Sequence, residues 1–291
     1  MSVNVNVGGN WKDVVPYVNV GGVWKVAEQA WVNVSGTWSP IYQATRGVFG
    51  GGSEDPSFNL VNIIDYIIIE TTSNATDFGD LLTSINTLTA CSSSTRGLFG
   101  GGYNTGYSNT IEYITISSTG NSTDFGDLTI IRRDLAACSS PTRGLFGGGY
   151  SYAGGADTNV ITYLTIATTG NTVDFGQLTR IRHGLTACSS STRGLFSGGY
   201  QGSWTENVID YVTIATTGNA TDFGDLTLKR YLLGSCSSPL RGLFSGGWEA
   251  GFINIIDYVT IATTGNATDF SDLTRARCQF GACSNGHGGL V

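Results

Sequence analysis

Charged residues are scarce in this sequence, and basic ones especially so. Only 13% of the 291 residues are charged and the formal net charge is -7, whereas an average domain has about 25% charged residues. Lysine occurs only at Lys12, Lys25 and Lys229. Proteins that bind nucleic acid need basic side chains to neutralise the phosphates, so we expect no nucleic-acid partner.

Long apolar runs are also missing. No run approaches the ~18 apolar residues of a membrane-spanning helix. The first residues, Met-Ser-Val-Asn-Val-Asn, lack the basic and apolar regions of a secretory signal peptide. We therefore expect neither membrane insertion nor export by the Sec route.

Glycine is abundant, with 42 residues, and the chain is built on a repeat. The motif Arg-Gly-(Leu/Val)-Phe occurs five times at intervals of 47 to 50 residues. All of the length variation lies in one loop, between a Gly-Gly pair and the next apolar run, while 41 positions per copy keep their spacing. A fixed scaffold with one variable loop is typical of repeat proteins that bind through that loop. The copies begin at Arg46, Arg96, Arg143, Arg193 and Arg241.

Each copy predicts four β-strands. In the fourth copy, residues 193–200, 208–214, 220–226 and 232–237 are rich in β-branched, aromatic or small residues and are separated by Gly-rich or polar turns. Apolar residues do not recur at helical spacing. Four-stranded units of this length match the blades of a β-propeller. A β-solenoid is the alternative, but its coils usually need about 20 to 30 residues, so each copy would be a double coil.

The sequence therefore predicts an all-β, five-bladed propeller over residues 40–291. Its ring has two candidate closing strands: residues 281–284 complete the first blade, or residues 41–45 are a degenerate copy of the same strand.

Five of the six cysteines recur at one position of the repeat. Equivalent positions of adjacent packed sheets lie roughly 10 Å apart, beyond the ~7 Å Cα limit of a disulfide. We interpret these residues as small buried apolar side chains, rather than as redox or metal groups. The sixth, Cys278, is an incidental thiol on this interpretation. The recurring residues are Cys91, Cys138, Cys188, Cys236 and Cys283.

Residues 1–39 repeat on a shorter period. Three segments of the type Val-Asn-Val-Gly-Gly-x-Trp each predict a small β-hairpin, with the Gly-Gly or Ser-Gly pair at the turn. An isolated hairpin is marginal in water and exposed tryptophans need a partner, so we expect this segment to attach the protein to something else. Its tryptophans are Trp11, Trp24, Trp31 and Trp38.

Two resemblances follow from these motifs. A Gly-Gly pair ending one strand, an aromatic in the next and a second aromatic further on resemble kelch repeats, which implies a kelch-like propeller over residues 46–287. Tandem Val-Gly-Gly-x-Trp-Lys hairpins joined to Gly-rich repeats resemble virion proteins of tailed bacteriophages, particularly tail-fibre and surface-appendage proteins. The aromatic positions are Tyr66, Tyr113, Tyr163, Tyr211 and Tyr258, followed by Phe78, Phe125, Phe175, Phe223 and Phe270.

The sequence offers no recurring catalytic group. Its two histidines, His183 and His287, lie at non-equivalent positions of the repeat, so no Ser-His or Cys-His pairing recurs. The Asp-Phe-Gly motif lacks the Gly-rich loop and His-Arg-Asp loop of a kinase. Paired carboxylates suggest a Ca²⁺ site, but Gln177 interrupts the series. We interpret these carboxylates as acceptors for turn amides or for the repeated arginine, and expect no enzyme, cofactor or metal.

The variable loops are the candidate binding sites. Exposed aromatic side chains stack on sugar rings or anchor protein partners; alternatively, they cap the blade edges. The candidate residues are Tyr103, Tyr107, Tyr150, Tyr152, Tyr200, Trp204, Trp248 and Phe252, with Phe58 in the first loop.

The leading hypothesis is a non-enzymatic phage tail-fibre or appendage protein of the virion, assembled in the host cytoplasm. Its hairpins dock to other virion proteins, within a homo-oligomer or larger assembly, and its loops bind a host-surface glycan or protein. The alternatives are a purely structural decoration or tail-assembly subunit, and a free carbohydrate-binding lectin.

Overall fold

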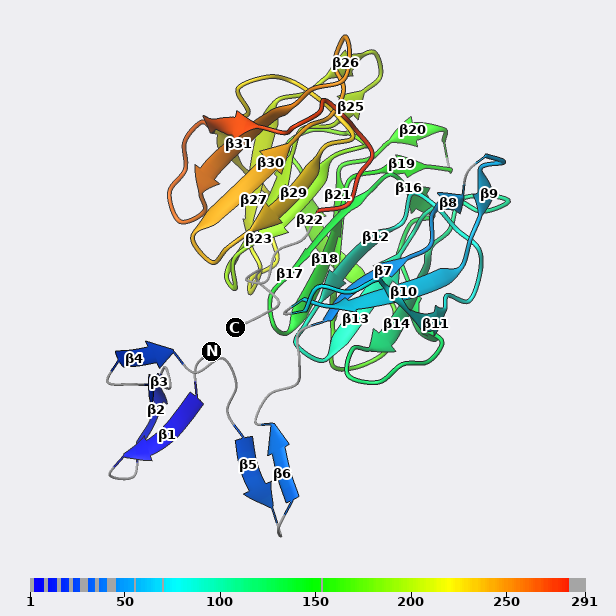
Figure 1. Cartoon of the computed structure of the whole chain (residues 1–291). Helices are drawn as coiled ribbons and strands as arrows, with labels where there is room; N and C mark the ends of the chain where they lie inside the picture. The colour runs from blue at the N-terminus through cyan, green and yellow to red at the C-terminus, as the bar shows by residue number, and fades with distance from the viewer. Residues whose placement is uncertain are drawn as a thin grey trace. The chain divides into compact units, whose positions relative to one another are not determined.

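The computed structural model describes residues 46–282 except positions 55, 70 and 153, and the backbone of six strands between residues 3 and 40. Contacts divide the chain into two compact units, Met1–Thr45 and Arg46–Val291. The described elements are all β-strands (Figure 1). Within this part of the chain no helix is long and apolar enough to cross a membrane.

The N-terminal unit contains the three predicted hairpins. In each, two short antiparallel strands are joined through two residues, as the register shows. The tryptophan side chains, and the docking role assigned to them, lie outside the described residues. The pairs are β1 (Val3–Val7) with β2 (Asn10–Val14), β3 (Tyr17–Val20) with β4 (Val23–Val26), and β5 (Trp31–Val34) with β6 (Thr37–Pro40).

The larger unit contains five antiparallel sheets, called blades 1 to 5 below, which confirms the all-β prediction and is consistent with a propeller-like fold. Blade 1 has three described strands and the others have the predicted four. Blade 1 comprises β7 (Arg46–Gly50), β10 (Ile63–Ile68) and β11 (Thr76–Asp80). Blade 2 comprises β12 (Thr89–Ser92), β13 (Arg96–Gly100), β14 (Thr110–Thr115) and β15 (Thr123–Asp127).

The remaining blades repeat this pattern. Blade 3 comprises β17 (Ala136–Ser139), β18 (Arg143–Gly147), β21 (Val160–Thr165) and β22 (Val173–Gln177). Blade 4 comprises β23 (Thr186–Ser189), β24 (Arg193–Ser197), β27 (Val208–Thr213) and β28 (Thr221–Asp225). Blade 5 comprises β29 (Gly234–Ser237), β30 (Arg241–Ser245), β31 (Ile255–Thr260) and β32 (Thr268–Asp272).

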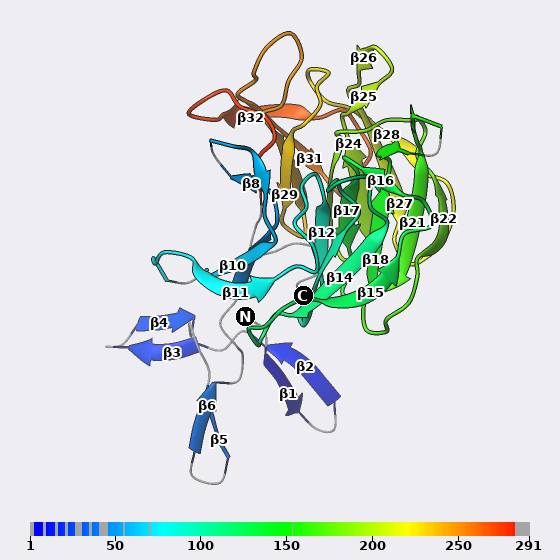
Figure 2. The same ribbon diagram turned by 90° about the vertical axis from the view of Figure 1, so that its right-hand side faces the viewer.

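The strands of small residues lie innermost. β12, β17, β23 and β29 contact one another in sequence order and the other strands extend outward from them (Figures 1 and 2). Serine hydroxyls connect them: Ser139 Oγ donates to the Ser92 carbonyl at 2.7 Å, and Ser189 Oγ donates to the Ser139 carbonyl at 2.7 Å. Small side chains are needed here because the strands converge.

The repeated cysteines fill space between blades. The Cys91 thiol lies against Gly144 of the next blade, so closely that a Cβ built on that glycine would stand 2.9 Å from Sγ. Cys138 and Cys188 are buried, as predicted for small apolar side chains, and no disulfide involves them. Burial raises the pKa of the Cys91 thiol to about 12, because an apolar environment disfavours the thiolate.

Blades 2 to 5 also each insert a phenylalanine into the preceding blade. The rings of Phe146, Phe196 and Phe244 are fully buried, and a Cβ on Gly100 would stand 2.9 Å from the Phe146 ring. Burial of such a ring stabilises a fold by roughly 1.5–3 kcal/mol. Glycine faces the ring at Gly50, Gly100 and Gly147, and Ser197 occupies the equivalent position of blade 4.

The repeated arginine of the Arg-Gly-(Leu/Val)-Phe motif bonds to backbone carbonyls. Arg143 Cζ lies 4.6 Å above the Tyr163 ring, and its Nη1 donates to the carbonyls of Ile214 and Ala215 at 3.0 and 2.8 Å. The Asp-Phe-Gly carboxylates were predicted to accept from this arginine or from turn amides. The first prediction is wrong, because no ion pair of the described residues involves this arginine and its Nη1 donates to backbone carbonyls instead. Asp222 accepts from the Gly224 N–H at 3.2 Å, but both residues lie in strand β28 and not in a turn.

A second arginine set is buried in the crossovers, the segments that join one blade to the next. Arg182 and Asp210 are both fully buried and their Nη2 and Oδ2 atoms are 2.9 Å apart. Arg182 also donates to the carbonyls of Gly198, Val208 and Phe196. The crossover of blade 3 is thereby fastened to blade 4. Arg132 and Arg230 occupy the equivalent positions before blades 3 and 5.

At the outer edge, two glycines meet across each contact between consecutive blades. A Cβ on Gly126 of β15 would stand 2.5 Å from the carbonyl carbon of Gly170 in the turn of blade 3. The Asp127 N–H beside it donates to Asn171 Oδ1 at 3.0 Å. The asparagine of this turn therefore joins two blades.

Blades 5 and 1 lack the glycine pair that joins the four pairs of consecutive blades. The positions of the two glycines are occupied by Ser271 on β32 and Ser73 in the turn of blade 1, so the same close approach cannot form. Phe49 is 50% exposed and Phe270 is 51% exposed, whereas their counterparts in the other contacts are buried. The ends of the blade array therefore do not pack on each other as consecutive blades do.

Candidate functional site

The variable loops and the crossovers come together at one end of the blades. The first aromatic residue after the Gly-Gly pair forms a short antiparallel ladder with a crossover residue of the preceding copy. His183 and Tyr200, for example, exchange two backbone hydrogen bonds of 3.0 and 2.8 Å. The pairs are Asn86 with Tyr103, Arg133 with Tyr150, His183 with Tyr200, and Tyr231 with Trp248.

Two-residue strands frame these loops. The crossover strand β16 (Arg132–Arg133) pairs with β19 (Tyr150–Ser151), which pairs with β20 (Ala156–Asp157). In blade 4, β25 (Tyr200–Gln201) pairs with β26 (Trp204–Thr205). In blade 1, β8 (Ser53–Glu54) pairs with β9 (Asn59–Leu60).

Aromatic rings of three successive loops and their crossovers touch one another in a line, here called the aromatic row. Tyr107 contacts Tyr103, Tyr150 and Tyr152, with ring centroids 5.7, 6.0 and 5.7 Å apart. These contacts are edge-to-face, an arrangement that stabilises aromatic pairs. The first part of the row therefore spans the loops of blades 2 and 3.

The row continues through the crossover of blade 3. The His183 ring lies 5.6 Å from Tyr150 and 5.5 Å from Tyr200, and Tyr200 lies 5.1 Å from Tyr231. Tyr231 pairs through its backbone with Trp248, whose ring contacts Phe252 at 4.7 Å.

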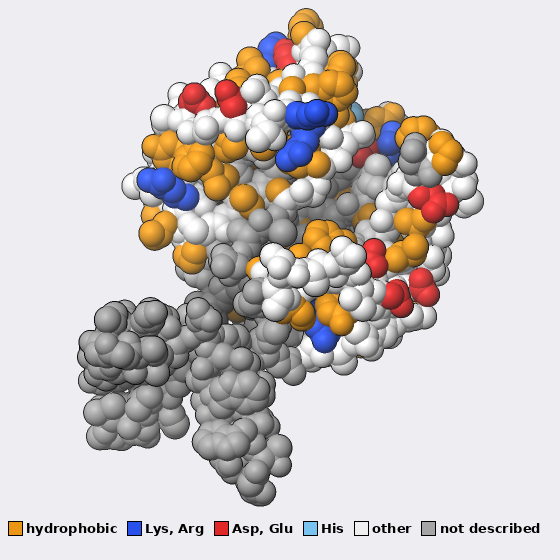
Figure 3. Space-filling view, in the orientation of Figure 1, with side chains coloured by type: hydrophobic (Ala, Val, Ile, Leu, Met, Phe, Trp, Pro, Cys, Tyr) orange, Lys and Arg blue, Asp and Glu red, His pale blue; other side chains and the backbone are white. Residues whose placement is uncertain are grey.

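Several of these side chains face solvent. Tyr152 and Trp204 are each 70% exposed, Phe252 is 59% exposed, and the other members are half-buried or only slightly more exposed. Hydrophobic side chains are visible around β20, β25 and β26 at this end of the molecule (Figure 3). Trp204 makes no ring contact with the row and stands at the tip of its own loop.

Arg133 lies among three tyrosines. Its Cζ atom is 6.0, 5.2 and 5.6 Å from the ring centroids of Tyr103, Tyr107 and Tyr150. Its Nη1 is 3.0 Å from Asp134 Oδ2, and the arginine side chain is 35% exposed. Desolvation raises the pKa of the Asp134 carboxyl, while Arg133 opposes that shift. The partly exposed guanidinium gives this part of the row a polar, cationic group.

An acidic side chain joins His183 to the neighbouring loop. Asp157 Oδ1 is 2.6 Å from His183 Nδ1, and Asp157 Oδ2 accepts the Gly202 N–H at 3.0 Å. One carboxylate thus connects the loop of blade 3, its crossover and the loop of blade 4. The loops are positioned by fixed contacts as well as by their own strands.

The crossovers are themselves spaced by a backbone ladder. The Asp134 N–H donates to the Thr87 carbonyl, the Gly184 N–H to the Asp134 carbonyl and the Leu232 N–H to the Gly184 carbonyl, at 3.2, 2.8 and 2.7 Å. These four residues have φ between 51° and 62°. The ladder sets the distance between consecutive row members, because Asp134, Gly184 and Leu232 directly follow Arg133, His183 and Tyr231.

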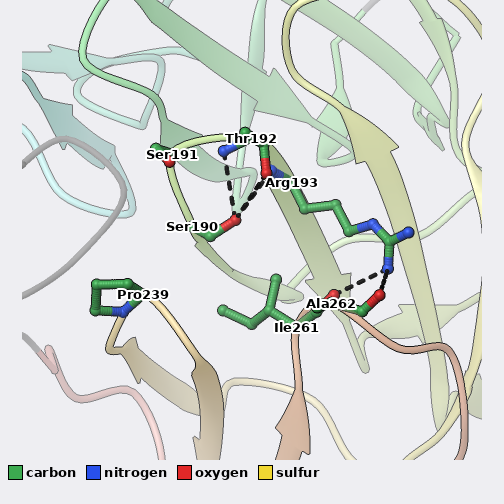
Figure 4. Close-up of a pocket in the computed structure, with 7 residues that line it drawn as sticks. All are labelled: Ser190, Ser191, Thr192, Arg193, Pro239, Ile261 and Ala262. Carbon is green, nitrogen blue, oxygen red and sulfur yellow. Dashed lines mark hydrogen bonds between the residues drawn. The ribbon is translucent and has the colours of Figure 1, made fainter.

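A hollow of about 300 Å³ lies at the other end of blades 4 and 5, lined by Ser190, Arg193 and Ile261 among others (Figure 4). Ser190 Oγ accepts the N–H groups of Thr192 and Arg193, and the Arg193 guanidinium donates to the carbonyls of Ile261 and Ala262 (Figure 4). These polar groups are engaged with one another as part of the packing between the blades.

The structure brings most of the predicted loop residues together. Tyr103, Tyr107, Tyr150, Tyr152 and Tyr200 belong to one continuous row, Trp248 and Phe252 extend it through the backbone, and Trp204 stands apart. Phe58 is 78% exposed and makes no ring contact among the described residues. Trp11, Trp24 and Trp38 lie on hairpin strands, as does Trp31.

Sequence reasoning missed the crossover members. Asn86, Arg133, His183, Tyr231 and Cys278 occupy one position of the fixed scaffold, yet no two are alike. A position that changes in every copy, inside a segment of constant length, was the available signal. This signal shows that the residues occupy equivalent positions of the repeat. It does not show that each pairs with the loop of the following copy.

No group of three or more potential metal ligands occurs within residues 46–282 as described. Neither a protein-family model nor a curated protein sequence matches the chain.

Proposed function

We propose that this protein is a non-enzymatic component of a tailed-phage virion, and that its aromatic row recognises a host-surface glycan or protein. The observation that carries the proposal is the row itself. It is formed by variable loops and variable crossover residues, on a scaffold whose spacing is constant. Aromatic faces with polar neighbours are suited to stacking on sugar rings and to anchoring protein partners. The N-terminal hairpins dock to other virion proteins in this proposal.

The proposal extends to the architecture. Five blades form one closed propeller ring, with a kelch-like arrangement of strands and with the row on one rim. Five copies of the motif and four equivalent contacts between consecutive blades support this count.

Binding to host cells and to a panel of bacterial surface polysaccharides tests the recognition. Tyr152→Ala and Trp204→Ala each remove a side chain that is 70% exposed, so folding should be retained while saturable binding falls at least ~10-fold. The matched control is Leu240→Ala, which removes a 73% exposed apolar side chain from the turn between β29 and β30, at the opposite end of the strands. Binding that both loop variants retain would overturn the proposal.

The second candidate function is that of a purely structural subunit. The exposed apolar side chains of the loops support it as well as they support recognition, if neighbouring subunits cover them. In that case the unaltered free protein would not bind cells, and the loop variants would lower incorporation into particles. Comparing particle incorporation with cell binding for the same variants separates the two functions.

A further inference from the structure

Arg133 supplies the guanidinium of the aromatic row, and most of its N–H donors are unused. Among the described residues it is bonded to Asp134 alone, with Nη1 3.0 Å from Oδ2. Nε is buried without a partner there, whereas Nη2 is neither bonded nor buried. The scaffold arginine Arg182, in contrast, donates to three carbonyls and one carboxylate. Because a guanidinium carries five N–H donors, Arg133 retains donors that a ligand can use.

Three tyrosine rings fix the position of this guanidinium. Its Cζ lies between 5.2 and 6.0 Å from the ring centroids of Tyr103, Tyr107 and Tyr150, within the range of cation–π attraction. The rings are fixed in turn, since Tyr107 packs edge-to-face on the other two and the Tyr150 hydroxyl donates to the Gly155 carbonyl at 2.8 Å. A group that is already positioned loses little conformational freedom when a ligand binds.

The carboxylates in this part of the row are buried more deeply than the groups with which they pair. The Asp134 side chain is 12% exposed, against 35% for Arg133. The Asp157 side chain is 7% exposed, against 21% for its partner His183. Residues 103–109, in the loop of blade 2, include no charged side chain. The surface around Arg133 therefore favours a ligand that carries hydrogen-bond acceptors.

Acidic side chains on both sides make blades 2 and 3 the favoured place for an anionic group. Glu54, in the loop of blade 1, is exposed. Glu206 and Glu249, in the loops of blades 4 and 5, lie 3.8 and 3.5 Å from Arg180 and Lys229, so the basic groups there already face a carboxylate of their own loop end. An anion elsewhere on the rim would meet these carboxylates.

We propose that Arg133 binds the carboxylate of an acidic sugar unit in a host-surface polysaccharide, with the sugar ring lying against Tyr103 and Tyr152. This inference rests on the proposed function and names the class of ligand. Arginine and a carboxylate form two parallel N–H···O bonds, because both groups are planar. Asp134 also favours a carboxylate over a phosphate monoester, since a single negative charge is repelled less than a double one.

The packing of the rings favours a sugar over a protein partner. Aromatic anchors of protein interfaces enter pockets on the partner. Tyr103, Tyr107 and Tyr150 are instead packed on one another, so they form a surface on which a pyranose ring can lie. Tyr152, which is 70% exposed and contacts Tyr107, extends that surface. The hydroxyls of Tyr103 and Tyr107 make no hydrogen bond to a described residue, which leaves them for sugar hydroxyls.

Binding to acidic polysaccharides and to their carboxyl-reduced forms tests the proposal. The probes are alginate, polygalacturonate and hyaluronan; reduction converts each carboxylate to a hydroxymethyl group and keeps the sugar rings. We expect the full-length protein to bind at least one acidic polymer, and to bind its reduced form at least ~10-fold more weakly because a charge-assisted pair is lost. Isothermal titration calorimetry gives both affinities.

Variants of Arg133 assign that difference to the guanidinium. Arg133→Gln should weaken binding of the acidic polymer at least ~10-fold and leave binding of the reduced polymer unchanged. Arg133→Lys keeps the charge but loses the planar pair of donors, and its affinity should lie between the two. Arg180→Gln is the matched control, because it removes an exposed arginine that pairs with Glu206 and contacts no ring among the described residues. It should change the affinity by less than ~3-fold.

Three results would overturn the proposal. The first is equal affinity for the acidic and the reduced polymers. The second is an equal loss of both affinities in Arg133→Gln, which would mean that the arginine only supports the rings. The third is binding of none of the acidic polymers, and Arg133-dependent binding of dextran sulfate in that case would assign the site to sulfate. Host-cell binding that Tyr152→Ala still weakens would show, in each case, that the proposed function stands without this ligand.

Discussion

The contact between Gly126 and Gly170 of consecutive blades allows a specific prediction about stability. Gly126→Ala adds a Cβ that would stand 2.5 Å from the Gly170 carbonyl carbon and 2.9 Å from the Asn171 nitrogen. Gly170→Ala, at the other side of the same contact, adds a Cβ with nothing within 4 Å. The two glycines have φ of 141° and 153°, so both substitutions impose similar backbone strain.

The expected losses of stability differ between the two variants, because one suffers backbone strain alone and the other also suffers overpacking. An alanine held at such φ costs about 1–3 kcal/mol, which is the full expected effect of Gly170→Ala. Gly126→Ala carries that strain and also forces two blades apart, at a further cost of about 1–3 kcal/mol for overpacking. The shift also strains the bonds from the Gly170 N–H to the Phe125 carbonyl and from the Asp127 N–H to Asn171 Oδ1. Gly126→Ala should thus unfold with about 2–6 kcal/mol less free energy.

Thermal and urea unfolding of both variants is the assay. For a unit of this size 1 kcal/mol corresponds to roughly 2–4 °C, so Gly126→Ala should melt at least ~2 °C below Gly170→Ala. Ser271 occupies the position in blade 5 that corresponds to Gly126, and there it faces no glycine of a following blade. Ser271→Ala should therefore change the free energy of unfolding by less than ~0.5 kcal/mol. Equal Tm values for Gly126→Ala and Gly170→Ala would show that the two blades do not approach as described, and the reasoning would fail.

Three further results are expected. Asp210→Ala leaves the buried Arg182 guanidinium without its anionic partner and should lower the free energy of unfolding by about 3–5 kcal/mol, measured by urea denaturation. The Cys138 thiol, whose pKa burial raises, should stay unreactive toward a disulfide reagent at pH 8 until the protein unfolds; rapid native labelling would contradict its burial. Arg143→Lys keeps the charge but loses the planar group that lies over Tyr163 while donating to two carbonyls, and should cost about 1–2 kcal/mol; an unchanged Tm would refute that role.

Much of the scaffold could be predicted because its signals are local. Each signal depends only on neighbours in the sequence, and each recurs through the copies of the repeat. These signals are the alternation of strand residues, the Gly-Gly pair and small residues such as those around Cys138. The four-stranded sheets and the inner position of the Ala-Cys-Ser strands follow from those signals. The three N-terminal hairpins follow in the same way from their turn pairs.

The partners of polar side chains could not be predicted, because they lie in the next blade. The repeated arginine was one of two predicted donors to the carboxylates, yet Arg143 reaches carbonyls 71 and 72 residues away. Asn171 lies in a turn of blade 3 and accepts from the Asp127 N–H of blade 2. Such contacts cannot be identified from the sequence, because the partners are far apart in it and every copy of the repeat contains several acceptors of the same kind.

The sequence by itself determined that the chain is an all-β repeat with one variable loop per copy, because strand and turn preferences are set by each residue and its immediate neighbours. Only the tertiary structure decided which side chains meet at the rim. Arg133 and His183 join the aromatic row because each crossover pairs with the loop of the following blade. That pairing depends on how blades pack, through buried rings, thiols against glycines and the buried pairs Arg182–Asp210 and Arg230–Asp257, and none of these contacts joins residues close in sequence.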